Sequence, residues 1–449
     1  MRIIMKWTLV ILGLMCIGIG PLSAESLQGA VARVDITPPP GLSMWGFAAR
    51  KGPSAGTLDP LYARILVLAS ADKRIAVVTL DLGRSFGPDS LASLQEKVHK
   101  SSNITYLLVA ASHTHSGPVV ANRYPENHVP DWETAAIANI AKAIDTACAH
   151  LVAVQVGADY GSTYIGYNRL QTKLDRGSML FGNDSTQIIS SPVDPTVAVL
   201  RINTQDGQPM AILVNYACHA VVFGADNLHY SADFPATMAS TVEKAFPNHP
   251  LVFFLQGGAG DIDPYYANTP LQQDAQRWRE WTGDRLGTEV VRVARKIQTQ
   301  AEPDGTLNFV DDTMTVPTRW DLTKFAEAYA RIWNKTRVNQ HAPGLKPETA
   351  LRTSTLLINK RIAFMSMSGE PFVDLQIDWR NRCPVTASFF VGYANGYDGY
   401  FPTITAAVRG GYGANNAQTW AEVGSGERMV NNSVVRVYEM LGKLTDTPQ

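Results

Sequence analysis

The sequence of 449 residues contains little cysteine and no long runs of one charge. It has four cysteines and no Cys-x-x-Cys pair, so it is not a disulfide scaffold and has no cysteine zinc site. The 39 lysines and arginines nearly balance the 40 aspartates and glutamates, and they form no basic block. The charge pattern therefore gives no support for nucleic-acid binding.

Long apolar stretches are confined to the N-terminus. A basic start containing Arg2 and Lys6 is followed by an apolar run and then by small residues up to Ala24. This order predicts a secretory signal peptide over residues 1–24, since the apolar run is short for a membrane span and Met15 before Cys16 does not suit a lipoprotein. We expect residues 25–449 to form a single soluble domain that is secreted or periplasmic and has no transmembrane segment.

Apolar runs of strand length alternate with helical patterns along the rest of the chain. Strands are predicted at 29–37, 61–70, 74–82, 106–111, 152–157, 197–202, 210–216, 251–255, 353–358, 361–367 and 387–393. Helices are predicted at 88–100, 131–150, 233–246, 272–299, 322–335 and 372–380, with Asp131 as one candidate cap and Ser231 or Asp233 as another. This mixture predicts an α/β fold in which mixed β-sheets are flanked by helices.

Two histidines follow the predicted strand 106–111, in the order His113-Thr114-His115. On an extended backbone, residues i and i+2 point to the same face, which places the two imidazoles roughly 6–7 Å apart. Imidazole binds zinc and also titrates near neutral pH. We therefore expect one histidine to hold a metal and the other to move protons, although packed or surface histidines remain the alternative.

Further polar residues follow other predicted strands, in glycine-rich surroundings. They are His219, Asp261, Asp263, Glu370 and Tyr397. Active sites of α/β folds are commonly assembled at strand ends, so this recurrence predicts a shared active site there. The loop around Met44–Phe47 carries large side chains beside a glycine, which is typical of a binding loop or of a hydrophobic plug.

These pieces, in their order along the chain, resemble the neutral (non-lysosomal) ceramidase family. The matching pieces are Val34-Asp35-Ile36-Thr37 with Gly46, Leu80-Asp81-Leu82-Gly83, His113-Thr114-His115-Ser116-Gly117-Pro118, Asn168-Arg169, Asn215-Tyr216-Ala217-Cys218-His219, Ser231-Ala232-Asp233, Gly260-Asp261, Gly369-Glu370 and Asn395-Gly396-Tyr397. Together they span nearly all of the chain after the predicted signal peptide. The resemblance implies a ceramidase-like catalytic domain.

The resemblance also implies an activity and a set of site residues. Members of the family are secreted or membrane-associated zinc amidases that cut the N-acyl bond of ceramide. The zinc ligands of the family correspond to His113, His219, Glu370 and Tyr397. His115 corresponds to the proton-transfer residue, Arg169 to an oxyanion stabiliser, and Tyr412 to a second phenol. Zinc would lower the pKa of water towards about 7 and polarise the amide carbonyl.

The chain departs from the family in two places. Family members carry a serine where this sequence has Asp263, which excludes a covalent serine mechanism there and leaves a zinc-water mechanism. The added carboxylate suits a polar or cationic substrate group. Well-studied ceramidases continue into a C-terminal β-sandwich, whereas this sequence ends at Gln449. Ceramide is therefore one candidate among N-acylated, lipid-like or small-molecule amides.

Each assigned residue has a structural alternative. His219 would also suit a buried strand end, and Glu370 would also cap the helix that follows it. Tyr397 would also serve as packing, with Tyr400 as the ligand in its place. Arg169 would also pair with Asp175 or another carboxylate. A polar cluster of Asp226, His229 and Asp233 suits turn and capping roles better than a second metal. For the whole protein, the alternatives are a zinc esterase or hydrolase of a smaller soluble substrate, and an envelope- or carbohydrate-binding protein with a structural metal.

Overall fold

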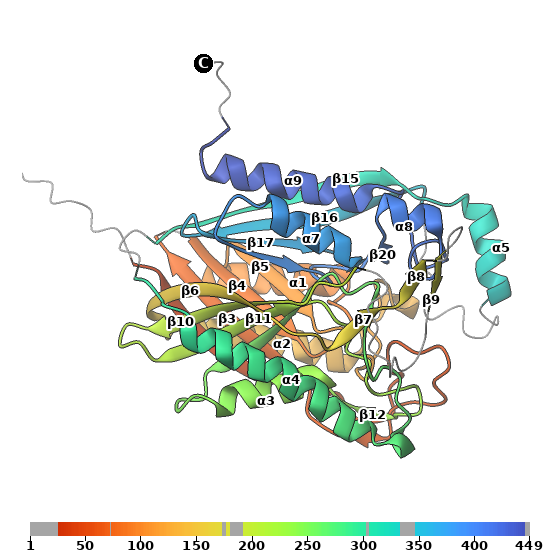
Figure 1. Ribbon diagram of the computed structural model, residues 1–449, viewed down its shortest axis with the longest axis horizontal. Helices are drawn as coiled ribbons and strands as arrows, with labels where there is room; N and C mark the ends of the chain where they lie inside the picture. The colour runs from red at the N-terminus through yellow and green to blue at the C-terminus, as the bar shows by residue number, and fades with distance from the viewer. Residues whose placement is uncertain are drawn as a thin grey trace, which may run out of the picture.

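Two β-sheets lie face to face between two layers of helices in the computed structural model (Figure 1). The structure describes residues 26–71, 73–172, 177–179, 192–301, 305–332 and 346–444. The predicted signal peptide lies outside the described residues. Within the described ranges, no helix combines the length and the apolar character that crossing a membrane requires.

The larger sheet has eight strands in the order β13-β11-β10-β6-β1-β3-β4-β5. Their bounds are β1 (Gln28–Asp35), β3 (Tyr62–Ser70), β4 (Lys73–Leu80), β5 (Tyr106–Ala111), β6 (Val152–Ser162), β10 (Thr196–Thr204), β11 (Pro209–Tyr216) and β13 (Leu251–Gln256). The pairs β4–β5 and β11–β13 are parallel, and the other pairs are antiparallel. The parallel strands are apolar along their length because layers cover both faces of the sheet.

The smaller sheet has four strands in the order β15-β16-β17-β19. They are β15 (Leu307–Pro317), β16 (Glu348–Ile358), β17 (Ile362–Met367) and β19 (Ala387–Val391). Its inner face carries Leu356, Phe364 and Phe389, which pack in one core with Leu66 and Phe253 of the larger sheet. This shared core fixes the two sheets against each other, so residues at their ends meet in one place.

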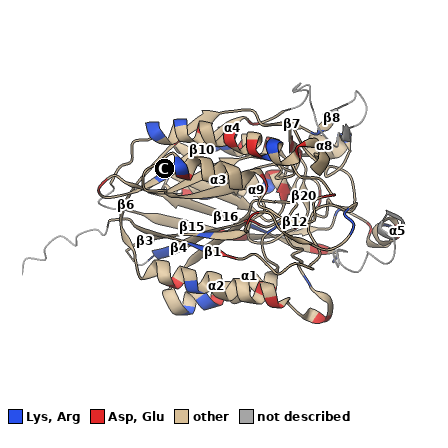
Figure 2. Cartoon of the chain, turned by 90° about the horizontal axis from the view of Figure 1, so that it is seen from below, with Lys and Arg blue, Asp and Glu red and all other residues tan. Residues whose placement is uncertain are grey.

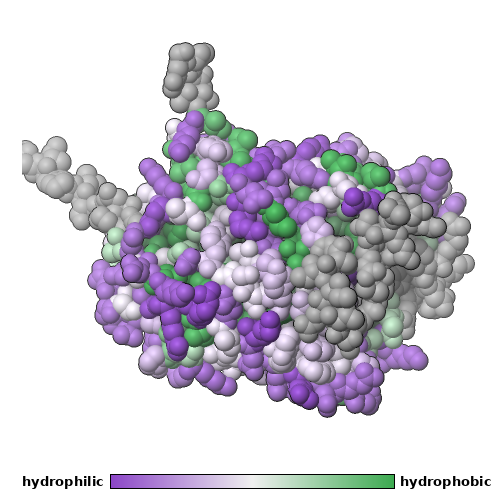
Figure 3. All heavy atoms as spheres, viewed as in Figure 1, coloured by the Kyte–Doolittle hydropathy of each residue, from purple (hydrophilic) through white to green (hydrophobic). Residues whose placement is uncertain are grey.

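Helices cover the outer faces of both sheets. They are α1 (Pro88–Ser102), α2 (Asp131–Cys148), α3 (Phe234–Lys244) and α4 (Ala275–Lys296) on the larger sheet, and α7 (Val373–Arg382) and α9 (Ser425–Met440) on the smaller one. Charged residues are concentrated on helices and loops, and the strands between them are largely uncharged (Figure 2). On the face in Figure 3, hydrophilic residues predominate and hydrophobic ones form small separate areas.

Short elements surround the ends of the sheets. They are β2 (Gly56–Thr57), β7 (Gly166–Asn168), β8 (Leu170–Thr172), β9 (Gly177–Met179), β12 (His229–Tyr230), β14 (Ile262–Pro264), β18 (Glu370–Pro371), β20 (Tyr400–Phe401), the 3-10 turns Pro125–Asn127 and Leu271–Gln273, and the helices α5 (Leu322–Ile332) and α8 (Ile404–Arg409). Several of them flank the residues that the sequence singles out. The α/β class with mixed, helix-flanked sheets is confirmed.

Of the two predicted helix caps, one is wrong and one is confirmed. Asp131 does not cap α2, because Pro130 occupies the N-cap and Asp131 lies in the first turn, where its charge favours the helix dipole. Asp233 does cap α3, since its carboxylate accepts a hydrogen bond of 2.6 Å from the backbone N–H of Phe234. The sequence predicted neither α9 nor the long edge strand β15.

Candidate active site

Three buried side chains converge on one carboxylate oxygen. The Nε2 atoms of His113 and His219 each lie 3.3 Å from Oε2 of Glu370, and all three side chains are at most 3% exposed. The other oxygen, Oε1, accepts a hydrogen bond from the hydroxyl of Tyr397. The ends of β5, β11 and β17 deliver the two histidines and Glu370, so the strand-end arrangement brings the four predicted ligands together.

The two imidazoles are held in one tautomer by the backbone. Nδ1 of His113 donates to the carbonyl oxygen of Gly83, and Nδ1 of His219 donates to that of Ala259 at 2.6 Å. Because carbonyl oxygens only accept, each Nδ1 carries the hydrogen and each Nε2 points a lone pair at Glu370. A histidine that ligates a metal is commonly oriented by such a bond from its other nitrogen.

The cluster fits a metal cation. Nε2 of His219 and Oε2 of Glu370 are both buried acceptors, and neither has a hydrogen-bond partner among the described residues. Two facing lone pairs at 3.3 Å repel unless a cation lies between them. A tetrahedral zinc with bonds of about 2.0–2.1 Å to nitrogen and oxygen would place its ligand atoms roughly 3.3 Å apart. The donor types and the spacing therefore suit zinc.

His115 lies beside this cluster, but the backbone that places it there differs from the predicted extended strand. Strand β5 ends at Ala111, and His113 has a left-handed backbone with φ of 65°, so the two histidines do not share an extended strand. That turn brings Nε2 of His115 to 3.3 Å from Nε2 of His113, closer than the extended geometry allows. His113, His115 and His219 thus form a group whose ligand atoms lie within 4.8 Å of one another.

Burial and charge tune these groups in opposite directions. Burial disfavours the charged form of Glu370, but the adjacent His113 and His219 outweigh it and hold the pKa of this carboxyl well below its usual value. Burial, reinforced by the neighbouring His113, lowers the pKa of His115 well below its usual value. Burial also lowers the pKa of His219. These shifts favour the anionic form of Glu370 and the neutral forms of His115 and His219.

Arg169 lies on the neighbouring side of the site and is paired with Asp263. Its Nη1 donates to Oδ1 of Asp263 at 3.0 Å, and its Nη2 donates to the carbonyl oxygen of Gly260 and to the hydroxyl of Tyr400. Its guanidinium also lies 5.7 Å from the ring centre of Tyr412. Burial opposes the charge of Arg169, but the Asp263 carboxylate outweighs it and raises the pKa of Arg169 further above its usual value.

The two tyrosines left open by the sequence have different partners. The hydroxyl of Tyr397 bonds to Glu370, whereas the hydroxyl of Tyr400 accepts from Arg169 at 3.1 Å. The ring of Tyr400 packs edge-on against Tyr412 at 5.6 Å. Tyr397 therefore lies beside the two histidines and Glu370, and Tyr400 and Tyr412 lie on the arginine side.

Aromatic residues of the Met44–Phe47 loop border the cluster. The ring of Phe47 lies edge-on against His115 at 4.9 Å, and Trp45 lies edge-on against Tyr397 at 5.5 Å. Met44 is buried and fits the role of a hydrophobic plug. Trp45 and Phe47 are half-buried and border the cluster. Arg50 donates to the carbonyl oxygens of Trp45 and His115 and so ties the loop to the second histidine.

The contacts also show the partners of Asp261, Asp263 and Asp233, which bear on the structural alternatives. Glu370 does not cap α7, where Asp261 accepts the N–H of Val373 at 2.8 Å instead. Asp175 lies outside the described residues, and Asp263 is the carboxylate that Arg169 contacts. Asp233 caps α3 and also accepts the N–H of Phe223, four residues after His219.

The sequence did not single out several residues that shape the site. The carbonyls of Gly83 and Ala259 lie in motifs that the sequence flagged, but a carbonyl acceptor has no residue signature. The guanidinium of Arg84 lies 4.6 Å from the ring centre of Tyr397, and its only signal is a charge directly after a buried strand. Tyr393 lies 4.2 Å from His113, ring to ring, and the sequence indicated it only as the last residue of a predicted strand.

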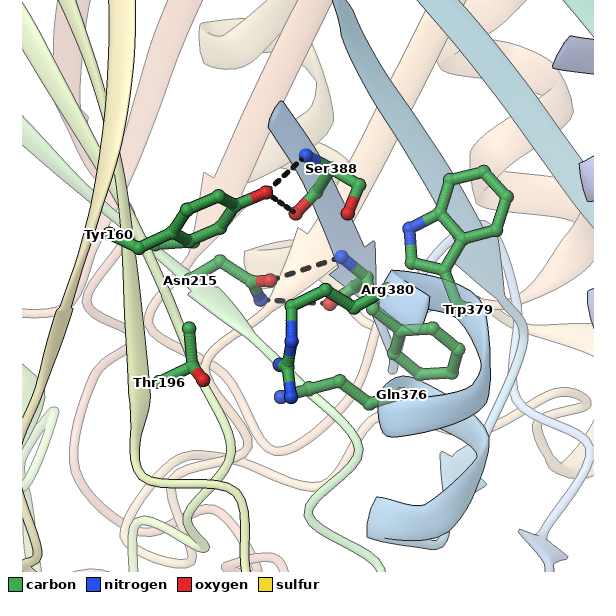
Figure 4. A pocket seen from close by; sticks show the side chains of 9 residues that line it. Tyr160, Thr196, Asn215, Gln376, Trp379, Arg380 and Ser388 are labelled. Carbon is green, nitrogen blue, oxygen red and sulfur yellow. Dashed lines mark hydrogen bonds between the residues drawn. The ribbon is translucent and has the colours of Figure 1, made fainter. Parts of the chain in front are cut away.

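A small cavity lies apart from this cluster, between the two sheets and α7 (Figure 4). It measures about 10 Å³, the room that a single water needs. The hydroxyl of Tyr160 bonds to the backbone of Ser388, and Asn215 bonds to the backbone of Phe390 across it. These bonds tie the larger sheet to β19, and none of the predicted site residues lines the cavity.

A buried group of imidazoles, a carboxylate and a phenol at the strand ends of an α/β sandwich is typical of metal-dependent hydrolases. The chain belongs to the neutral/alkaline non-lysosomal ceramidase family, whose N-terminal domain matches residues 28–277. Two of the four predicted ligands, His113 and His219, fall in that range, and Glu370 and Tyr397 follow it. Comparison of the sequence with curated proteins gives no match.

Solved structures show the same fold. The crystal structure of neutral ceramidase from Pseudomonas aeruginosa is similar with a TM-score of 0.74 and 16% identity, covering 94% of this chain and 76% of that one. A ceramidase complexed with C2 is similar with a TM-score of 0.75 and 17% identity, again over 94% and 76% of the two chains. At this level of identity the likeness concerns the fold.

Proposed function

We propose that this protein is a zinc-dependent amidase that hydrolyses the N-acyl bond of ceramide or of a related N-acylated substrate. The observation that carries the proposal is the convergence of His113 and His219 on one buried oxygen of Glu370, each at 3.3 Å. Membership of the ceramidase family supports an amide substrate with a lipid character. The N-terminal pattern of residues 1–24 supports export of the chain, with residues 25–449 as one catalytic domain.

In this proposal His113, His219, Glu370 and Tyr397 hold the zinc ion. Bound zinc supplies Lewis acidity, which lowers the pKa of water and polarises a carbonyl. The backbone bonds to Gly83 and Ala259 keep the histidine lone pairs aimed at the ion before it arrives. Such preorganisation reduces the rearrangement that binding requires.

His115 is the proposed proton carrier. The Nδ1 atoms of His113 and His219 are each fixed by a carbonyl, but Nδ1 of His115 is buried without a partner in the described part of the chain. This asymmetry separates two ligands, whose tautomers are fixed, from one residue whose tautomer no hydrogen bond to Nδ1 fixes. As a neutral imidazole next to the ligands, His115 can take a proton from water and deliver it to the leaving amine.

Arg169 is the proposed oxyanion stabiliser. Its charge is held by Asp263, the carbonyl of Gly260 and the hydroxyl of Tyr400, and its ring neighbour Tyr412 supplies a second phenol on the same side. A fixed cation placed before the reaction stabilises negative charge that develops on a carbonyl oxygen. Asp263 acts here by orienting Arg169, because their ion pair is buried on both sides.

The test is hydrolysis of a panel of substrates by the purified chain, with and without a metal chelator. The panel contains ceramides of several acyl lengths, N-acyl amines without a sphingoid base, and matched esters. The proposal expects amide hydrolysis that chelator abolishes and added zinc restores. Turnover of esters only would point to an esterase, and chelator-resistant turnover would refute the zinc mechanism.

A further inference from the structure

One segment lies between the strand that carries His113 and the strand that carries Glu370. Residues 392–398 follow β19 and run along the edge strand β5, where Ala111 donates to the carbonyl of Tyr393 at 3.1 Å and Asn395 donates to that of Val109 at 2.9 Å. On the other side, Tyr393 donates to the carbonyl of Gly369 at 2.8 Å. The segment thus connects the two halves of the site by its backbone, and the side chain of Asn395 adds bonds to the backbone of Val109 and Leu107.

Tyr393 adopts a costly backbone conformation in this segment. Its φ is 56°, in the left-handed region that a bulky residue rarely enters. Such a conformation is unfavourable and persists only where surrounding contacts enforce it. Tyr393 is 0% exposed and makes backbone bonds on both sides, which meets that condition.

Tyr393 contacts the supports of three proposed ligands, two through its ring and one through its backbone. It lies 4.2 Å from the imidazole of His113, tilted by 30°, and packs with Ala111 and Ala259 in one buried cluster. Ala259 provides the carbonyl that orients His219, and the backbone N–H of Tyr393 bonds to the residue before Glu370. The ring therefore lies against His113 and against the residue that orients His219, and the backbone of the same residue is bonded next to Glu370.

The hydroxyl contributes little to this arrangement. It is buried and has no hydrogen-bond partner within the described ranges. A buried unsatisfied hydroxyl costs stability, so the residue is held by its ring and backbone and not by its polar end. Substitutions at this position can therefore separate the effect of the ring from the effect of the hydroxyl.

We propose that Tyr393 is a positioning residue of the metal centre, whose ring and left-handed backbone hold His113 and Glu370 at the spacing that zinc requires. The proposal rests on the proposed function, since it assigns a role toward the same ion. It predicts that loss of the ring weakens zinc binding and that loss of the hydroxyl does not.

The experiment measures zinc affinity of the full chain by competition with a chromophoric chelator. The variants are Tyr393→Phe, which keeps the ring, and Tyr393→Leu, which removes it. A third variant, Tyr393→Gly, removes the ring and relieves the left-handed backbone, so it keeps the test open if the leucine variant fails to fold. Tyr106→Leu is the matched control, because Tyr106 is also buried on β5 and stacks on Phe309 away from the site.

We expect Tyr393→Leu and Tyr393→Gly to lose zinc affinity by roughly 10- to 100-fold, the range seen when residues that orient metal ligands are removed. Tyr393→Phe and Tyr106→Leu should bind zinc as wild type does, and the visible spectrum of bound Co²⁺ should change only in the ring-deleted variants. Wild-type affinity in both ring-deleted variants would overturn the inference while leaving the zinc proposal intact. Failure of the wild-type chain to bind zinc would overturn both.

Discussion

The pairing of Asp263 with Arg169 makes a sharp prediction about stability. The two side chains are 1% and 6% exposed, so the ion pair is screened from water on both sides. Replacing Asp263 with asparagine keeps the shape of the side chain and removes its charge. The guanidinium of Arg169 would then remain buried with neutral hydrogen-bond acceptors but no carboxylate beside it: the amide oxygen of the substituted side chain, the Gly260 carbonyl and the Tyr400 hydroxyl.

The magnitude follows from that burial. Breaking a buried pair by removing one partner typically costs about 3–5 kcal/mol, because an uncompensated charge stays in the interior. An exposed pair is worth about 0.2–1 kcal/mol. Asp312 and Arg436 provide the comparison, since they form a two-pronged ion pair while 21% and 36% exposed. Asp312→Asn is therefore the matched control for Asp263→Asn.

The assay is urea unfolding followed by circular dichroism, with chelator present so that metal binding does not add to stability. We expect the free energy of unfolding to fall by about 3–5 kcal/mol in Asp263→Asn and by less than about 1 kcal/mol in Asp312→Asn. Adding Arg169→Met to the Asp263→Asn chain should restore most of the loss, because no buried charge is then left alone. Equal effects of the two single substitutions would refute the view that Asp263 holds Arg169.

Three further predictions concern the site and its supports. Gly46 has φ of 102°, and a Cβ there would lie 2.3 Å from Cγ of His115, so Gly46→Ala should lose turnover and keep its zinc content in metal analysis. Tyr397→Phe should lower zinc affinity in chelator competition, whereas Tyr400→Phe should not, because only the Tyr397 hydroxyl bonds to Glu370. Burial raises the pKa of Asp233 from 3.8 to about 6, so the folded chain holds this proton more tightly than the unfolded chain does. That contribution to stability is full below 3.8 and lost as pH rises through about 6. The free energy of unfolding of Asp233→Asn should therefore rise by up to about 3 kcal/mol relative to wild type as pH increases through this window, as measured by urea titrations. A difference that does not change with pH would contradict the burial argument.

The sequence was sufficient for the layers and for the strand-end location of the polar residues. Period and composition predicted β5 and α1 within two residues of their observed ends, because apolar strands and amphipathic helices have strong local patterns. The edge strand β15 was missed, since it is mostly half-buried or exposed and carries two adjacent aspartates, a composition that resembles a loop. Helix α9 was missed although its buried face is regular.

The geometry of the site depended on contacts that a sequence does not display. The two histidines of His113-Thr114-His115 come together through a left-handed turn and not through an extended strand. The carbonyls that orient His113 and His219 belong to Gly83 and Ala259, whose side chains have no polar groups. Such partners are set by the packing of distant segments, so they become visible only in three dimensions.

Metal analysis of three chains tests the central claim most directly. The wild-type protein, His113→Ala and His115→Ala are purified without chelator, and their zinc content is compared. We predict close to one zinc per chain in the wild type and in His115→Ala, and none in His113→Ala, because His113, unlike His115, faces Glu370 with its second nitrogen fixed by a carbonyl. A wild-type chain without zinc, or equal loss of zinc in both variants, would contradict the account.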